Sequence, residues 1–292
     1  MQTMRSGTRR AAVVSIDEGV DRALFPHRQA VMAIGLYIIG DEILSGKRQD
    51  RHFAKVQELL AARGMQLQWV QYLADEPALL EQAFRASFAR GDVALSCGGI
   101  GATPDDHTRQ SAAAALDLPL QLHPKARELI GQRIVSAGLG DPASAANQQR
   151  LQMGMFPSGA DIVPNPYNQI PGFSIRDHYF VPGFPVMAWP MLEWVLEGPL
   201  RALHRSGAYL ERACIVAGAM ESDLTPLMER IERVHAPVKV FSLPSVDHPQ
   251  WGRHIELGVK GEPAAVQPAF EMLKAGLAEL GAEVRTETVR TL

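Results

Sequence analysis

The chain has 292 residues, of which 46% are hydrophobic and 21% are charged, and its formal net charge is −3. Such a composition is ordinary for a globular protein, and it offers no positive field that would attract nucleic acid or an anionic membrane. Two cysteines are too few for a disulfide framework, and no apolar run reaches the ~20 residues that span a bilayer. We therefore expect a cytoplasmic protein that binds neither nucleic acid nor membrane.

The first 31 residues differ in character from the rest of the chain. They are rich in arginine, and their apolar run AAVVSI is too short for the core of a signal peptide. Met32 stands directly before the first convincing strand. We expect residues 1–31 to form a poorly ordered extension, or to reflect a start assigned too far upstream, rather than a functional arm.

From residue 33 the pattern alternates between strand and helix. The continuous apolar run 33–39 is typical of a strand buried on both faces of a parallel sheet. The elements predicted next are a helix over 52–64, a strand over 66–72, a helix from Pro77 to Arg90 and a strand over 92–97. Two consecutive strand–helix–strand units predict right-handed crossovers and a doubly wound α/β layer.

The following region is less regular. Residues 124–156 are predicted to be helical with a break around 138–142, and residues 161–173 are predicted to be extended and rich in turns. A short strand within 178–185 then leads into a helix that we expect to reach about Leu203. We assign residues 32–204 to one α/β domain.

The pattern changes again near residue 207. From there the predicted order is strand, helix, strand, strand, helix, strand, which is the βαββαβ order of a small α+β domain. We assign residues 208–292 to this second domain, with a boundary near 204–208.

The stretch SCGGIGATPDDHTRQ, residues 96–110, places three glycines at the end of a predicted strand. Gly98, Gly99 and Gly101 would let the backbone approach a bound group closely, because no Cβ intervenes. Their amides, with a helix beginning near Thr108, suit an anion such as phosphate. The sequence fits neither a Walker loop nor a GxGxxG motif.

Two adjacent carboxylates follow these glycines. Asp105 and Asp106 suit a hard cation such as Mg²⁺, which takes one or two carboxylates together with phosphate oxygens. The alternative is a glycine-rich turn in which Asp106 only caps the next helix. Neither the histidines nor Cys97 form a recognisable metal or nucleophile motif, so we expect these residues to be structural.

Other loops fall at the same predicted edge of the sheet. The loop GDEILSG, residues 40–46, follows the first strand, and ligands of open parallel sheets bind outside the carboxyl ends of strands. Two Pro/Gly loops, 165–172 and 181–188, could form walls of the pocket, although each could also be a simple turn. The ligand-binding candidates in these loops are Gly40, Asp41, Glu42, Ser45, Asn165, Pro182 and Gly183.

The motifs GDEILSG, GGIGATPDDHT, NPYNQIPG and VPGFP resemble, in order and spacing, the molybdopterin-binding-fold domain of the CinA family. The glycine–aspartate loop also resembles that of the MoaB and MogA molybdenum-cofactor proteins. The resemblance covers about residues 33–290 and implies a three-layer α/β domain with a mostly parallel sheet. It also implies a homo-oligomer, either dimer or trimer, which the apolar stretch 189–200 supports weakly. A CinA-type C-terminal deamidase domain is not expected within 292 residues.

This resemblance implies binding of a phosphorylated pterin, such as molybdopterin, or of a nucleotide, with a divalent cation (Mg²⁺, Mn²⁺ or Co²⁺). We expect Asp106 and Asp41 to hold the cation, and Ser45 and Thr108 to donate hydrogen bonds. A role in molybdenum-cofactor metabolism follows as one hypothesis. Metal-dependent cleavage of ADP-ribose-type pyrophosphates, with Asp106 and Asp105 as catalytic residues, is a second, and a non-catalytic binding protein is a third.

The chain departs from the family pattern at several positions. Cys97 and Ala102 replace a threonine and a proline of the glycine loop, and Asn168 and Ile170 replace a glycine and an alanine of the next loop. The family pattern PG-x-P-S-E-M reads PGFPVMA here, so its glutamate is missing. This last departure argues for weak or altered catalysis.

Overall fold

The computed structural model describes residues 33–141, 143–204 and 210–291. The expected N-terminal extension, residues 1–31, lies outside these ranges. So do residues 205–209, and the division of the chain near 204–208 therefore stays a prediction. The parts before and after this point, residues 33–204 and 210–291, are described separately below.

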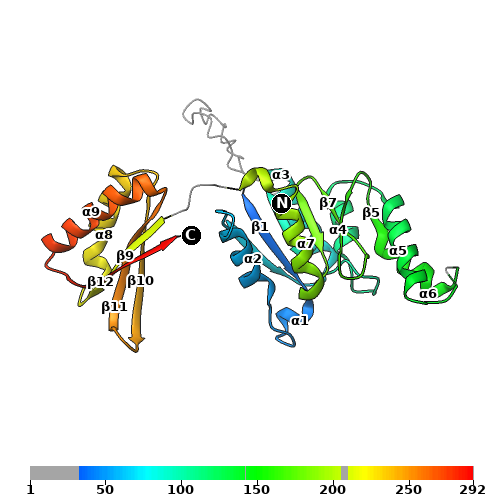
Figure 1. The fold of residues 1–292 in the computed structure, drawn as a ribbon, viewed down its shortest axis with the longest axis horizontal. Coiled ribbons are helices and arrows are strands. Elements are labelled where there is room, and N and C mark those ends of the chain that lie inside the picture. The colour runs from blue at the N-terminus through cyan, green and yellow to red at the C-terminus, as the bar shows by residue number, and fades with distance from the viewer. Residues whose placement is uncertain (1–32, 142, 205–209, 292) are drawn as a thin grey trace, which may run out of the picture. The chain divides into compact units, whose positions relative to one another are not determined.

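A six-stranded sheet organises residues 33–204 (Figure 1). Its spatial order is β2-β1-β3-β8-β7-β6, and its strands are β1 (Ile34–Ile39), β2 (Trp69–Leu73), β3 (Val93–Cys97), β6 (Asp161–Val163), β7 (Gly172–Ile175) and β8 (His178–Val181). Strands β2, β1, β3 and β8 run parallel, whereas β7 and β6 are antiparallel additions at one edge. The mostly parallel sheet is confirmed, and the segment predicted only as extended supplies its antiparallel edge.

Helices cover both faces of this sheet. The helices of residues 33–204 are α1 (Asp41–Leu44), α2 (His52–Ala61), α3 (Pro77–Arg90), α4 (Thr108–Ala115), α5 (Pro124–Ser136), α6 (Ala145–Leu151) and α7 (Pro185–Glu197), with 3₁₀ turns η1 (Gln152–Gly154) and η2 (Arg201–Leu203). Helices α2 and α7 share a core with one face and α3 and α4 with the other, which confirms the three-layer arrangement (Figure 1). No helix of the described ranges is long and apolar enough to cross a membrane.

Two predicted helices are shorter than expected. The helical stretch predicted to continue to residue 156 ends earlier, because β5 (Met155–Pro157) pairs with β4 (Leu120–Leu122) in an antiparallel ribbon. The helix predicted to reach Leu203 ends at Glu197, directly before Gly198 and Pro199, and only a 3₁₀ turn follows. Proline restricts the residue before it, so the Gly-Pro pair is a natural end for this helix.

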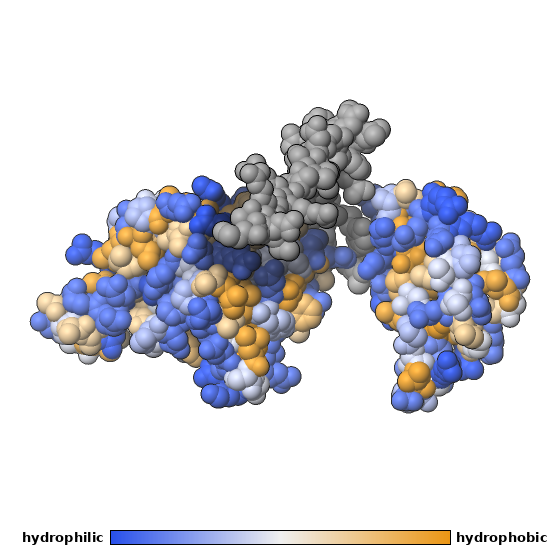
Figure 2. Space-filling model, turned by 180° about the vertical axis from the view of Figure 1, so that it is seen from behind, coloured by the Kyte–Doolittle hydropathy of each residue, from blue (hydrophilic) through white to orange (hydrophobic). Residues whose placement is uncertain are grey.

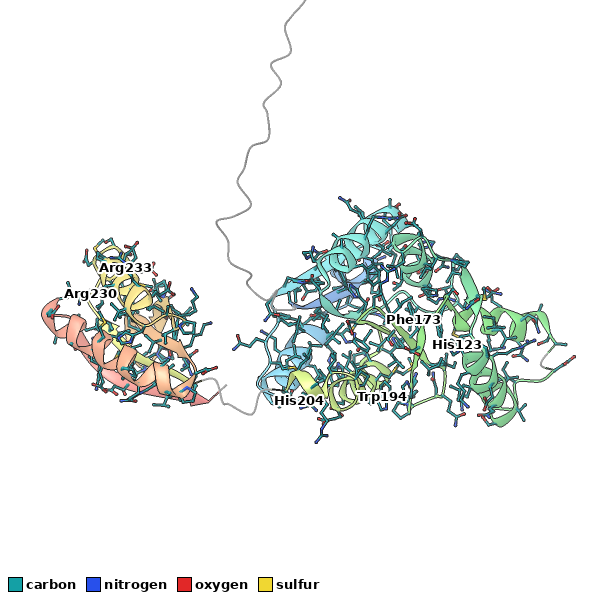
Figure 3. The ribbon with its side chains drawn as sticks, turned by 90° about the horizontal axis from the view of Figure 1, so that it is seen from above. His123, Phe173, Trp194, His204, Arg230 and Arg233 are labelled. Atoms are coloured by element: carbon teal, nitrogen blue, oxygen red, sulfur yellow. The ribbon has the colours of Figure 1, made fainter. Side chains whose placement is uncertain are left out.

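Strand β1 shows why the continuous apolar run forms a central strand. Successive side chains of a strand point to opposite faces, so Leu36 and Ile38 join the core under α2 and α7. Tyr37 and Ile39 join the core on the other face, under α3 and α4. That second core continues through Phe156, whose ring contacts those of Phe173 and His123 (Figure 3). The sheet is therefore buried on both sides, as an apolar run without alternation predicts.

A buried polar network links α3 to this sheet. His178 is fully buried, and its Nδ1 lies 2.9 Å from the carbonyl oxygen of Arg176. A carbonyl only accepts, so Nδ1 donates and Nε2 is left to accept from the Ser87 hydroxyl at 2.7 Å. Burial lowers the pKa of His178 from 6.5 to about 4. His178 is thus a neutral structural residue and not half of a catalytic pair.

Residues 210–291 form a separate four-stranded antiparallel sheet with two helices (Figure 1). The elements in chain order are β9 (Leu210–Ala217), α8 (Glu221–Val234), β10 (Lys239–His248), β11 (Gly252–Gly261), α9 (Pro263–Glu279) and β12 (Glu283–Thr291). The βαββαβ order is confirmed, and the strands are arranged β10-β11-β9-β12. Side chains of β9 and β11 pack against α8 and α9 in a core of their own, while Arg230 and Arg233 lie exposed on α8 (Figure 3).

The buried neutral histidine predicts how stability depends on pH. The folded protein resists protonating His178, so the unfolded state binds more protons as pH falls from 6.5 towards about 4, and stability is lost across this window. The free energy of unfolding should lose up to about 1.4 kcal/mol per pH unit through this group. Denaturant unfolding from pH 7 to 4 should therefore show a shallower pH slope for His178→Gln than for the wild type.

His235→Gln is the matched control, because His235 directly follows α8 in residues 210–291 and is no part of the sheet that contains His178. This variant should keep the slope of the wild type. Equal slopes for His178→Gln and the wild type would contradict the neutral, desolvated state of His178.

Candidate functional site

A pocket of about 510 Å³ lies where the central strands end. The loops after β1, β3 and β8 supply most of its lining, and the loop before β7 adds a further wall. The pocket thus lies at the carboxyl ends of parallel strands, which is the edge where the sequence predicts a ligand. Of the candidate residues, those that line the pocket are Gly40, Glu42, Gly98, Gly99, Gly101, Asp105, Asp106, Asn165, Pro182 and Gly183.

The glycine loop needs its glycines for two different reasons. Gly98 and Gly99 have φ angles of +115° and +66°, which side-chain-bearing residues rarely adopt. A Cβ on Gly98 would also stand 2.2 Å from the carbonyl oxygen of Ile39, so the ends of β1 and β3 approach too closely for any side chain. Gly183 differs, since a Cβ there would meet nothing nearer than 3.4 Å.

Asp106 closes this loop on itself. One carboxylate oxygen accepts from the Gly101 amide at 2.8 Å, and the other accepts from the Thr103 amide at 2.9 Å and from the Thr103 hydroxyl. Helix α4 begins at Thr108 after His107, without a side-chain cap, so the alternative in which Asp106 caps this helix is wrong.

The bonding of Asp106 divides the loop's backbone donors into two groups. The amide of Gly101 is occupied by the carboxylate and cannot serve a ligand at the same time. The amides of Gly99, Ile100 and Ala102 donate to no other group in the part of the chain that the structure describes. All three residues line the pocket, so unpaired donors suited to an anion are available there.

Two buried side chains of α4 hold the loop from behind. The Thr108 hydroxyl donates to the carbonyl of Gly98 at 3.0 Å, so this residue supports the loop and does not line the pocket. Arg109, which the sequence analysis missed, donates to the carbonyls of Gly101 and Gln152. Burial lowers the pKa of its guanidinium. An arginine in an otherwise alanine-rich helix directly after the glycine loop was the available signal.

The first loop contributes fewer residues than expected. Asp41 and Ser45 do not line the pocket, and Ser45 is exposed at the end of α1. The carboxylates of Asp41 and Asp75 each accept from the other residue's amide, at 3.2 and 3.0 Å. Asp75, which follows β2, lines the pocket, and the sequence analysis missed it as well. Ligands bind outside the carboxyl ends of parallel strands, and this rule applies to β2 as well as to its neighbours.

Four acidic residues line the pocket: Glu42, Asp75, Asp105 and Asp106. Burial raises the pKa of Asp75, and the charges of Asp41, Glu42 and Asp105 raise it further. Nevertheless, no three histidine, cysteine or acidic side chains of the described residues come together as a ready metal site. A cation bound here would therefore need oxygen atoms of the ligand as well.

Another part of the pocket lining is largely apolar. Asn165 is buried and shapes the loop, since its amide donates to the carbonyl of Ile170 at 3.0 Å. Ile170, Phe184 and Met187 line the pocket beside it. Met187 stands where the pattern PG-x-P-S-E-M has its glutamate, and its sulfur accepts from the Asn168 amide at 3.2 Å. A thioether thus replaces a carboxylate in this wall.

Comparisons with known proteins agree with this architecture. Residues 35–202 match the family model described as a probable molybdopterin binding domain, and the chain therefore belongs to this family. A protein of Aeropyrum pernix is 28% identical over 267 residues, which cover 85% of this chain and 95% of that protein. A CinA-like protein of Citrifermentans bemidjiense is 28% identical over 261 residues, which cover 88% of this chain but only 61% of that protein.

A solved structure is similar to part of the chain. The protein CinA of Thermoplasma acidophilum, described as of unknown function, is 23% identical with a TM-score of 0.49. The match covers 56% of this chain and 97% of that one. The family match thus gives this chain a molybdopterin-binding-type domain, and its sequence is similar to CinA-like proteins.

The two kinds of glycine at the site predict effects of different size on stability. Gly98→Ala should lower the free energy of unfolding by more than about 2 kcal/mol, because its Cβ collides with the Ile39 carbonyl and its φ is strained. Gly183→Ala should change stability by less than about 1 kcal/mol, since its Cβ has room. Denaturant unfolding of both variants tests the comparison, and similar stabilities would contradict the close approach at Gly98.

The raised pKa of Asp75 predicts a second effect. Because the folded protein disfavours the ionised form, the carboxylate costs stability above its folded pKa, and the cost disappears at acidic pH. Asp75→Asn should raise Tm at pH 7 by about 1 to 3 °C and leave it unchanged near pH 3. Asp161→Asn, an exposed position outside the pocket, is the control and should have no effect at either pH. A lower Tm for Asp75→Asn at pH 7 would overturn the prediction.

Proposed function

We propose that this chain binds a phosphorylated pterin or nucleotide in the pocket around its glycine loop. The observation that carries the proposal is the set of unpaired amides of Gly99, Ile100 and Ala102 in the pocket lining. Backbone amides in such a loop suit phosphate oxygens, and a cavity of about 510 Å³ has the size of a small-molecule site. The apolar wall of Ile170, Phe184 and Met187 suits a planar ring system.

The proposal includes a divalent cation, Mg²⁺, Mn²⁺ or Co²⁺, bound jointly by protein and ligand. Glu42, Asp75 and Asp105 are better placed for it than Asp41, which lies outside the lining, or Asp106, whose oxygens already accept three hydrogen bonds. Bound there, a cation would neutralise phosphate charge and lower the pKa of a coordinated water. It would also relieve the mutual repulsion that raises the pKa of Asp75.

Binding without turnover is the form of the proposal that we favour. Met187 occupies the position of the family glutamate, so the pocket lining offers no carboxylate there. A role in molybdenum-cofactor metabolism is compatible with such binding. The acidic residues of the pocket lining support the alternative, a metal-dependent pyrophosphatase acting on ADP-ribose-type substrates. Phosphate-ester release from ADP-ribose in the presence of each cation separates the two activities.

Homo-oligomerisation remains part of the proposal, but α7 supports it less than the sequence suggested. Ala188, Met191, Leu192 and Val195 of this helix are buried in the core of their own chain. Trp194 remains partly exposed on it (Figure 3). On the face shown in Figure 2, apolar and polar residues are interspersed. Light scattering would report the mass of the assembly against 31.9 kDa for one chain.

Asp105→Asn tests the cation-bridged site. Asp105 is exposed at the pocket and does not close the loop, so the variant should keep the stability of the wild type. The ligand is first chosen by thermal shift among ADP-ribose, FAD, NAD, GTP and a molybdopterin precursor. A ligand at about 100 times its Kd adds about 2.7 kcal/mol to the free energy of unfolding and therefore raises Tm. Isothermal titration should then show that Asp105→Asn binds the chosen ligand at least tenfold more weakly than the wild type in Mg²⁺, which equals about 1.4 kcal/mol. With chelator, the affinities of the two proteins should differ less than twofold.

Asp161→Asn again serves as the control and should bind like the wild type. If Asp105→Asn and the wild type bound equally in Mg²⁺ and in chelator, the cation-bridged site would be wrong. If none of the five compounds raised Tm, the phosphate site itself would be in doubt.

A further inference from the structure

A second pocket of about 340 Å³ adjoins the first. The two share part of their lining, including Glu42, Arg48 and Gly183. The second pocket is otherwise lined by the segment that leads into α2, including Arg51 and His52, and by the buried thiol of Cys97. Burial raises the pKa of that thiol, so it is an uncharged part of the wall and not a nucleophile.

The two arginines of this pocket have no acidic partner. Neither Arg48 nor Arg51 forms an ion pair with any residue that the structure describes. The guanidinium of Arg48 instead lies 5.9 Å from the ring centroid of Phe184. That of Arg51 lies 5.6 Å from the ring centroid of Trp189. The nearby carboxylate of Asp50 is occupied, because it accepts from the amides of His52 and Phe53 and from the hydroxyl of Tyr72. Two positive charges are therefore available to an anion.

The buried side chain of His52 supports this pocket from within. His52 is 95% buried, and its Nε2 lies 3.0 Å from the carbonyl oxygen of Gly183. Because a carbonyl only accepts, Nε2 donates to it. Gly183 lines both pockets, so this bond fixes the wall that they share.

We infer that the second pocket is a phosphoryl subsite, in which Arg48 and Arg51 pair with phosphoryl oxygens. Arginine suits this task because its planar guanidinium presents several donors to an oxyanion. Glu42 is the one acidic residue in the pocket lining, and the two guanidiniums outweigh its charge. The inference rests on the proposed function in one respect: the phosphoryl group belongs to the ligand of the first pocket. The ligand class is then a nucleoside or pterin diphosphate rather than a monophosphate.

Binding of AMP, ADP and inorganic pyrophosphate tests the subsite by isothermal titration in Mg²⁺. The wild type should bind ADP at least tenfold more tightly than AMP. Arg51→Gln should weaken ADP at least fivefold and change AMP less than twofold, because only the second phosphoryl group reaches this pocket. Arg51 is exposed, so the variant should fold normally. Arg127→Gln is the matched control, because Arg127 is exposed on α5 and lines neither pocket.

A spectroscopic measurement separates direct contact from a general loss of charge. Adding pyrophosphate should move the ¹⁵Nε resonance of Arg51 and leave that of Arg127, outside both pockets, in place. The subsite would be overturned if the wild type bound AMP and ADP equally and Arg51→Gln changed neither affinity. The proposed function of the first pocket would then still stand. Conversely, if pyrophosphate bound with dependence on Arg51 while AMP did not bind at all, the subsite would stand and the proposed function of the first pocket would fall.

Discussion

The carboxylate of Asp106 binds three donors of its own loop, and the shape of the candidate site depends on this interaction. By taking the amides of Gly101 and Thr103, it folds the chain back after the glycines. Arg109 fixes the same turn from the other side through the carbonyl of Gly101. What remains unpaired are the amides of Gly99, Ile100 and Ala102, so an internal ion–dipole contact determines which donors are left for a ligand.

The sequence predicted the central elements well, because buried strands and helix ends leave strong local signals. Helix α3 runs from Pro77 to Arg90 as predicted, since proline at the first position and Gly91 with a φ of +70° mark both ends. The pairing of β8 with β3, and the antiparallel addition of β7 and β6, left no such signal. Sheet order depends on contacts between distant segments, which one sequence does not display.

The same distinction applies to the candidate site. The glycine positions could be predicted, because a turn that admits no Cβ leaves glycine as the one suitable residue. The roles of the acids could not: Asp41 and Asp106 carry the expected charge, yet both are engaged by backbone amides. Asp75 and His52 act through partners that are distant in the sequence. Asp75 bonds to Asp41, 34 residues away, and His52 bonds to Gly183, 131 residues away. No local spacing in the sequence indicates either contact.

The position of Arg51 over the ring of Trp189 has an optical consequence. The emission of an indole responds to the electric field around it, and a guanidinium 5.6 Å from the ring centroid is a large part of that field. A ligand that draws Arg51 towards its own oxygens changes the field without touching the ring. Of the four tryptophans in the chain, Trp189 is thus the natural reporter of whether the pocket beside it is filled.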